Sequence, residues 1–262
     1  MTCKNCNNNL RTDYSFCPDC GAKVIRKRIT VKSLIFDFFE RYFNLDNTLL
    51  ATLKDIIIKP QAVCGGYISG LRKKYLDPVS LLAISLTLSG IIMFLMKKVA
   101  WKYIDFGAIG YAQTSSGGAG TQKIMEATME YSSFIYFFYI PIIACSSFVV
   151  FNKKQYNFPE HAVIATYSLT CFSIITTVYA FFALLISPQF YIDTAVLYIV
   201  IMIGFCLYVS YKNSGDTKKS LVWRIPVFLF LVFIGYIGIS VLTLGLLFIT
   251  GDLSVQDFIP KN

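Results

Sequence analysis

Four cysteines near the start of the chain are the residues whose type and spacing best suit chemistry. They form two C-x2-C pairs, Cys3 with Cys6 and Cys17 with Cys20, with ten residues between the pairs. Each pair can place two thiolates on one side of a tight turn, and two such turns complete a tetrahedral four-sulfur shell with metal–sulfur distances of about 2.3 Å. Gly21 suits the second turn, because glycine accepts a positive φ. The spacing therefore predicts a structural zinc site with no open position for catalysis.

The alternative for these cysteines is a pair of disulfides in an exported head. Either cross-link would hold together a zinc-ribbon-sized head, residues 1–24, that is too small to bury a core of its own. The cytosolic orientation derived below keeps thiols reduced and so favours zinc. The remaining cysteines stand singly on apolar or amphipathic stretches, where cysteine usually behaves as a small hydrophobe, and we assign no chemistry to Cys64, Cys145, Cys171 and Cys206.

The composition indicates a membrane protein. Apolar residues make up 55% of the 262, charged residues make up only 15%, and the mean hydropathy is +0.58, whereas an ordinary soluble domain is roughly 25% charged. Nearly every long apolar run lies after Pro78, and most of the charge lies before it. We therefore expect a membrane domain over residues 78–251 and a short outside tail over residues 252–262. No secretory signal peptide is visible, so the first span should direct insertion.

Five apolar runs are long enough to form the membrane-spanning helices of an all-α polytopic protein. The first has 18 uncharged residues, about 27 Å as a helix, which just spans the hydrocarbon core. Pro141 should kink the second run, and a very short turn should make the third and fourth an antiparallel hairpin. Three glycines in the fifth run, Gly235, Gly238 and Gly245, predict close helix packing. The five predicted spans are residues 79–96, 133–151, 162–187, 190–211 and 225–250.

Lysine and arginine are distributed unequally between the two sides of this topology. Residues 1–78, 152–161 and 212–224 lie on one side and hold 13, two and four of them. The other side holds five, so 19 of the 24 cations favour a cytosolic N-terminus and an outside C-terminus. The net charge of +9 follows from the same bias and does not require a nucleic-acid partner.

The segment between the head and the first span, residues 25–77, predicts basic amphipathic helices. Apolar residues recur at helical spacing over residues 31–42, opposite a charged face. A second helix should begin with Asp46 or Asn47 as its N-cap and stop before Pro60. Its buried face should consist of Leu49, Leu50, Leu53, Ile56 and Ile57. Two compatible interpretations remain open: a hairpin that packs on itself and on the spans, or an interfacial pair lying on the cytosolic leaflet.

A cationic cluster, Arg72 to Lys74, stands directly before the first span. A cation near anionic lipid contributes about 1 kcal/mol, so this cluster is typical of a juxtamembrane anchor. Asp77 as N-cap and Pro78 at the first helical position would start the span.

Evidence for chemistry inside the membrane is sparse. Transporters and proton pumps commonly hold an ionisable residue deep within a span, and none of the five predicted spans has one at its centre. Glu160 and His161 lie at the cytosolic start of the third span, and the chain has no second histidine. Hydroxyl side chains are dense in the third span, which favours helix-to-helix or backbone hydrogen bonds over a polar solute path. No P-loop, G-x-S-x-G, H-E-x-x-H or G-x-G-x-x-G motif is found, so no catalytic class is supported.

Three separated patterns together resemble one family. They are the cysteine pairs with Phe16-Cys17-Pro18-Asp19-Cys20-Gly21, the run from Arg72 through Tyr75 to Pro78, and Pro159-Glu160-His161 at the start of the third span. The family is DUF3667, mainly bacterial membrane proteins without an assigned activity and with an N-terminal zinc ribbon. The chain departs from the family pattern at Asn7 and Ala22, where glycine and glutamine are usual, and neither change removes a ligand.

The resemblance implies the architecture and a location in the bacterial inner membrane, and it implies no mechanism. It also directs attention to the residues that carry it outside the cysteine pairs, which are Arg72, Tyr75, Pro78, Glu160 and His161.

The favoured hypothesis is a membrane-anchored interaction, regulatory or assembly module, whose zinc head and amphipathic helices present a surface to a cytosolic or membrane protein partner. The lack of charge within the spans motivates it. The alternative is a small-solute channel or transporter, lined by the hydroxyl-rich third span and the kinked second span. Nucleic-acid binding by the head is weaker, because a few phosphate contacts give only salt-sensitive, non-specific affinity. We do not expect an enzyme, because Glu160 and His161 alone define no reaction.

Overall fold

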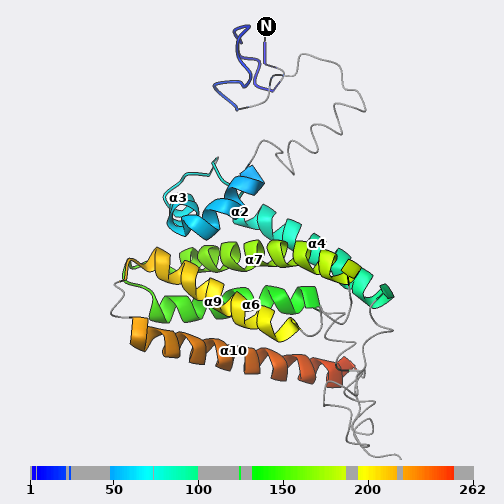
Figure 1. Ribbon diagram of the computed structural model, residues 1–262. Coiled ribbons are helices and arrows are strands. Elements are labelled where there is room, and N and C mark those ends of the chain that lie inside the picture. Colours follow the sequence, from blue (N-terminus) through cyan, green and yellow to red (C-terminus); the bar gives the residue numbers. More distant parts are fainter. Residues whose placement is uncertain are drawn as a thin grey trace, which may run out of the picture. The chain divides into compact units, whose positions relative to one another are not determined.

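The computed structural model describes residues 2–3, 5–21, 24, 48–72, 74–99, 124, 132–186, 194–216 and 221–250 (Figure 1). The chain divides into two compact units, Met1–Asp46 and Asn47–Asn262. The helix expected over residues 31–42, the N-cap expected at Asp46 or Asn47, and the tail over residues 252–262 lie outside the described residues.

Five long apolar helices form the second unit. They are α4 (Pro78–Val99), α6 (Ser132–Val150), α7 (Phe158–Ile186), α9 (Ala195–Ser214) and α10 (Leu221–Thr250). Four of them are long and apolar enough to cross a membrane, and within α6 the stretch Tyr136–Val150 is apolar but shorter. Strands are not found in the described part of the chain, which contains an isolated β-bridge between Thr2 and Asn9. The expectation of an all-α polytopic protein is confirmed.

Helix α7 is the centre of this bundle, because α4, α6 and α9 all contact it. Ring pairs between α7 and α9 join Phe172 to Phe205 and Tyr179 to Tyr198, so residue numbers rise along one helix as they fall along the other. The two helices are therefore antiparallel. In contrast, α4 runs parallel to α7, since its start contacts the first half of α7 and its end packs on Ala180.

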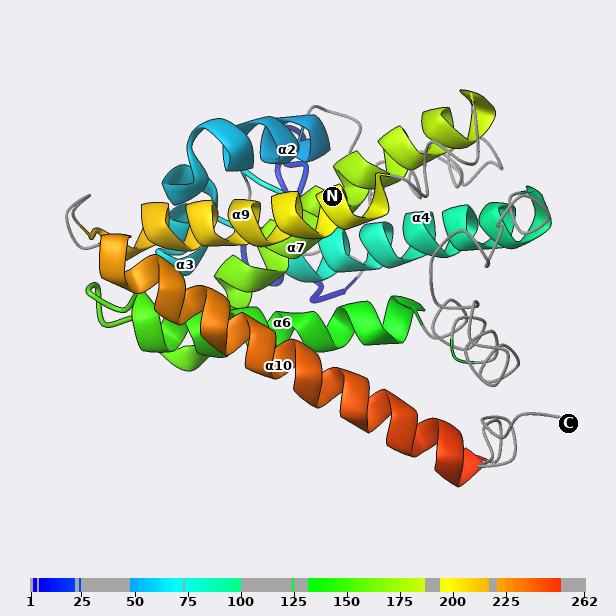
Figure 2. The ribbon, with the colours of Figure 1, turned by 60° about the horizontal axis from the view of Figure 1, so that its bottom comes forward.

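Close packing by glycine joins α6 to α10, which lie side by side in Figure 2. A Cβ added at Gly235 would lie 2.5 Å from Cγ2 of Ile142, so only glycine allows this approach. The expectation for Gly238 and Gly245 was wrong, because a Cβ at either position would meet open space. The bundle end at which α4, α7 and α10 begin and α6 and α9 end is called the basic end below.

A collar of short helices, residues 48–77, precedes α4. It contains α2 (Thr48–Ile58), the π-helical turn η1 (Gln61–Gly65) and α3 (Gly66–Ile68). The collar lies alongside α9 and not beyond its end, because the Tyr208 hydroxyl donates to the Ile57 carbonyl (2.9 Å) and the Gln61 amide donates to the Lys212 carbonyl (2.5 Å).

The prediction for the buried face of α2 was partly wrong. Ile56 is fully buried and Leu49 and Leu53 are half-buried, whereas Leu50 and Ile57 are 68% and 47% exposed. Only one narrow side of α2 is buried, and Thr52, which the prediction did not include, lies on it with Ile56. The helix stops at Ile58, as predicted, and the chain continues directly into η1.

Helices α4 and α7 begin at different levels. The Tyr167 hydroxyl donates to the Leu76 carbonyl (2.7 Å), two residues before α4 begins at Pro78. Tyr167 itself lies nine residues beyond the start of α7 at Phe158, which is about 14 Å of helix. Figure 2 likewise shows α4 beginning beside the middle of α7. The first turns of α7 therefore have no α4 beside them, and the collar occupies that place through its contacts from α2 and η1.

Candidate metal centre and the polar collar

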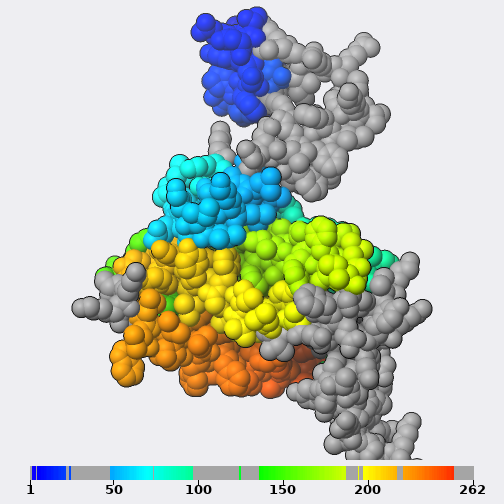
Figure 3. Space-filling view, in the orientation of Figure 1, coloured from blue at the N-terminus to red at the C-terminus, as the bar shows by residue number. Residues whose placement is uncertain are grey.

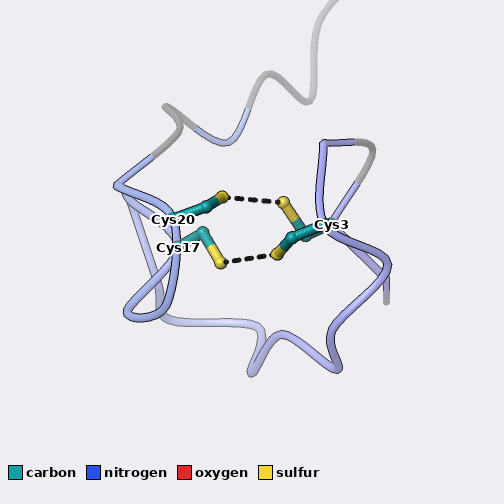
Figure 4. Close-up of side chains that lie close together, drawn as sticks. Cys3, Cys17 and Cys20 are labelled. Atoms are coloured by element: carbon teal, nitrogen blue, oxygen red, sulfur yellow. Dashed lines mark hydrogen bonds between the residues drawn. The ribbon is translucent and has the colours of Figure 1, made fainter.

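Four cysteine sulfurs converge in the N-terminal unit (Figure 4). The Sγ atoms of Cys3, Cys6, Cys17 and Cys20 all lie within 4.8 Å of one another. The separation is 3.7 Å from Cys3 to Cys20 and 3.5 Å from Cys6 to Cys17. A tetrahedron with metal–sulfur bonds of about 2.3 Å has sulfur–sulfur edges of about 3.8 Å, so this arrangement can hold a tetrahedral metal ion.

Disulfides do not account for this geometry. A disulfide bond is about 2.05 Å long, and the eight cysteines of the chain are all free. Because both of these separations join sulfurs from different pairs, both C-x2-C turns contribute to the same cluster.

The two C-x2-C turns have the same backbone. The amide of Asn7 donates to the Cys3 carbonyl and the amide of Gly21 donates to the Cys17 carbonyl, both at 2.9 Å. Both residues that close the turns have a positive φ, 59° at Asn7 and 69° at Gly21. Asparagine is among the few residues with a side chain that adopt this conformation readily. Asn7 therefore closes the first turn in the same way as Gly21 closes the second.

Burial and hydrogen bonding divide the cluster into inner and outer ligands. Cys3 and Cys17 pack against Leu10 in a small core, whereas Cys6 and Cys20 are exposed. Backbone amides of Asn5 and Cys6 lower the pKa of the Cys3 thiol. The pKa of Cys6 is raised to about 12, since the lowering effect of the Asn8 amide is outweighed by the Cys20 thiol, burial and the other thiols. Four thiolates at these separations require a cation between them, and metal binding to such ligands releases their protons.

A polar cluster within the collar joins α2 to the segment just before α4. Thr52 is fully buried, and its hydroxyl accepts a hydrogen bond from the Leu76 amide (3.0 Å) while donating to the Thr48 carbonyl. The Tyr75 hydroxyl donates to Oδ2 of Asp55 (2.8 Å). Desolvation, with Asp55 adding to it, raises the pKa of Tyr75 to about 12, so this phenol stays a neutral donor.

The residues singled out before α4 lie together at this cluster. Arg72 stands over the ring of Tyr67, which contacts the ring of Tyr167 edge-on. Asp77 caps α4 by accepting from the Ser80 amide (2.9 Å), and Pro78 is the first, buried residue of that helix. Asp77 and Pro78 thus act as the expected start signal.

Glu160 and His161 have different roles at the start of α7. Glu160 reaches back to accept from the Asn157 amide (2.7 Å), which is the carboxylate half of a capping box. His161 is only 1% exposed, and its Nδ1 lies 2.9 Å from the Ser147 hydroxyl of α6. Among the described residues, its buried Nε2 atom has no hydrogen-bond partner. His161 thus joins α6 to α7, and the rings of Phe148 and Tyr156 lie edge-on to it.

A further buried contact lies where η1 meets α9. The side chain of Cys64 is fully buried and interacts with Asn213, and burial raises the pKa of this thiol, so it is a neutral core residue. The Asn213 amide nitrogen donates to the Val209 carbonyl (2.9 Å), and its buried side-chain oxygen has no hydrogen-bond partner in the described part of the chain. The sequence analysis missed Thr52, Asp55 and Asn213. The apolar periodicity of their helices does not distinguish them from ordinary polar surface residues.

The hydroxyl groups of α7 bond mainly to their own helix. Thr166, Ser168, Thr170 and Thr176 each donate to the carbonyl four residues earlier, at 2.6 to 2.9 Å. This is the back-bonding expected of serine and threonine in apolar helices. Their presence therefore requires no polar path.

The comparison with known families gives a match that covers the collar. A family model described as a protein of unknown function, DUF3667, matches residues 46–90. The matched stretch comprises α2, η1, α3 and the first turns of α4, and it contains Arg72, Tyr75 and Pro78. The similarity to this family expected from the sequence is therefore confirmed over the collar. No curated protein and no solved structure matches the chain.

Proposed function

We propose that this chain is a membrane-anchored interaction module. Its four-cysteine head holds a structural zinc ion and presents a surface to a protein partner, while the helices keep the head at a bacterial inner membrane with the N-terminus in the cytosol. The observation that carries the proposal is the convergence of the four sulfurs within 4.8 Å, which makes the head a small domain folded by a metal.

The membrane helices favour an anchoring role over a catalytic one. In the described part of the five long helices, charged residues and histidine occupy only the terminal turns: Lys97, Lys98, Glu160, His161, Lys212 and Arg224. Intramembrane ionisable residues are the usual mark of proton relays and ion paths. Arg224 is also satisfied locally, since it pairs with Asp216 and donates to the Val150 carbonyl.

The head offers an apolar contact for a partner next to its ligands. Phe16 directly precedes Cys17 and is 59% exposed. An aromatic ring that a rigid turn holds in solvent loses little conformational entropy on binding. A protein partner is therefore expected to cover Phe16.

Affinity capture of the full chain from detergent tests the proposal. The wild type should hold one zinc ion per chain by elemental analysis and retain a stoichiometric protein partner. Cys17→Ser with Cys20→Ser should lose both, whereas the matched change of Cys145→Ser with Cys206→Ser should lose neither. Phe16→Ala should keep the metal and lose the partner. Full retention of the partner without the metal would refute the proposal.

The orientation is a separate part of the proposal. Tags on the two ends of the chain should be labelled from opposite faces of the membrane, with the N-terminal tag accessible from the cytosol. Transport is the competing outcome: movement of small polar solutes into liposomes by the purified protein would replace the anchoring role.

A further inference from the structure

Exposed cations at the basic end stand on tyrosine rings. Arg72 lies 5.5 Å from the centroid of Tyr67 and Lys74 lies 5.2 Å from that of Tyr75. The same arrangement places Lys154 over Tyr156 and Lys212 over Tyr208, at 5.7 and 6.0 Å. These separations are within the range of cation–π attraction. Within the described residues, none of these four cations has a carboxylate partner, so their charge is available to an anion.

The rings beneath these cations are held in place by the fold. The Tyr75 hydroxyl is bonded to Asp55, and the Tyr208 hydroxyl is bonded to the Ile57 carbonyl. Tyr67 meets the buried ring of Tyr167 edge-on. The tyrosines are therefore fixed platforms, and the cations stacked on them are partly ordered before any ligand arrives.

Exposed apolar side chains accompany the collar cations. Leu71, next to Arg72, is 57% exposed. On α2, Leu50 and Ile57 are seven residues apart and so share one face of the helix, which also carries the exposed Lys54. Figure 3 shows this part of the collar as a blue-to-cyan surface against α7 and α9. Apolar and cationic groups thus share one surface alongside the membrane helices.

We propose that the collar is a binding surface for anionic phospholipids, with Arg72 and Lys74 on the phosphates and Leu71 among the acyl chains. A nucleic acid could satisfy the cations, but it would not cover the exposed leucine and isoleucine beside the membrane helices. A phospholipid supplies both the negative headgroup and the apolar chain. This proposal does not depend on the metal centre or on a protein partner of the head.

Quenching of a single tryptophan by brominated lipid tests the surface in the intact protein. Trp101 and Trp223 are replaced by phenylalanine, and Leu71→Trp places the probe at the collar. The protein is reconstituted in phosphatidylcholine vesicles with phosphatidylglycerol as the minor component. Two preparations are compared, one with bromine on the acyl chains of phosphatidylcholine and one with bromine on those of phosphatidylglycerol. The mole fraction of brominated lipid is the same in both. Brominated phosphatidylglycerol should quench the probe more strongly, which measures its local enrichment.

Charge removal identifies the groups responsible. Arg72→Gln with Lys74→Gln should lower the preference for phosphatidylglycerol, by about fivefold in relative association constant for each cation lost. The charge-preserving pair Arg72→Lys with Lys74→Arg should retain it. A matched control, Lys97→Gln with Lys98→Gln, removes two charges at the other end of α4 and should leave it unchanged.

Three results would overturn the proposal. Equal quenching by the two brominated lipids would show no selectivity, and no quenching by either would place Leu71 in water. A preference that survives loss of both cations would assign the selectivity elsewhere. Retention of labelled RNA by protein in neutral vesicles, abolished by the same double change, would assign the cations to nucleic acid.

Discussion

The cysteine head and the collar organise polar groups in opposite ways. In the head, both halves of the site are five-residue turns with the same hydrogen bond and a positive φ at the closing residue, so most of the geometry is local. In the collar, the polar contacts that connect its parts to one another and to the bundle join residues far apart in sequence, with separations of 24 from Thr52 to Leu76, 91 from Leu76 to Tyr167 and 151 from Ile57 to Tyr208. The first arrangement can be closed by one metal ion, and the second needs the whole bundle.

The largest expected effect is a loss of structure in the head that leaves the helical unit unchanged. Cys17→Ser with Cys20→Ser should unfold the head, because binding of a structural zinc contributes about 10–16 kcal/mol to folding of such small domains. The helical unit should keep its thermal unfolding transition. Elemental analysis and limited proteolysis of the first 24 residues measure the loss, and added chelator should reproduce it in the wild type. A matching loss of stability in the helices would show that the regions are coupled.

A collar substitution should have the reverse pattern. Thr52→Val preserves shape but leaves the buried Leu76 amide without an acceptor, which costs about 1–3 kcal/mol. Hydrogen exchange at residues 74–77 should accelerate and the transition of the helical unit should fall, with the metal content unchanged. Thr87→Val is the control, since the Thr87 hydroxyl bonds only within α4. Equal effects of the two changes would contradict a special role for Thr52.

Asn7, which closes the first C-x2-C turn, allows a finer test of the backbone geometry of the head. Asn7→Ala should weaken the head by about 1–2 kcal/mol, because alanine in a left-handed conformation is strained. Asn7→Gly should be tolerated, since glycine adopts this conformation freely. Competition for zinc against a chromophoric chelator measures both variants. If alanine binds zinc as tightly as asparagine does, the backbone argument fails.

The smallest effect concerns alkaline stability of the collar. Tyr75→Phe should cost about 0.5–1.5 kcal/mol at neutral pH through loss of the bond to Asp55. Because folding raises the pKa of Tyr75 from 10.0 to about 12, its contribution is complete below about pH 10 and is lost as the pH rises towards 12. The variant should therefore lose less stability than the wild type over that interval. Thermal unfolding at stepped pH measures the difference, and parallel curves would refute the assignment.

The contrast between local turns in the head and long-range contacts in the collar also explains which features could be predicted from the sequence. The convergence of the four cysteines could be predicted because C-x2-C spacing acts through local turns. The long helices could be predicted because runs of apolar residues indicate directly that the segment is not exposed to water. Thr52, Asp55 and Asn213 were missed because their partners come from distant segments that no local period reveals. Leu50 and Ile57 were misplaced for a related reason: helical periodicity identifies an apolar face but not whether protein or lipid covers it.

The unequal starts of α4 and α7 make the protein sensitive to membrane thickness. As straight helices, the 22 residues of α4 and the 29 of α7 measure about 33 and 44 Å. A bilayer matched to the shorter helix leaves the turns around His161 at headgroup depth. A thicker membrane would draw the cations of the collar toward hydrocarbon, so local thinning of the bilayer must compensate. The offset between the starts of α4 and α7 therefore sets the bilayer thickness that the protein fits best.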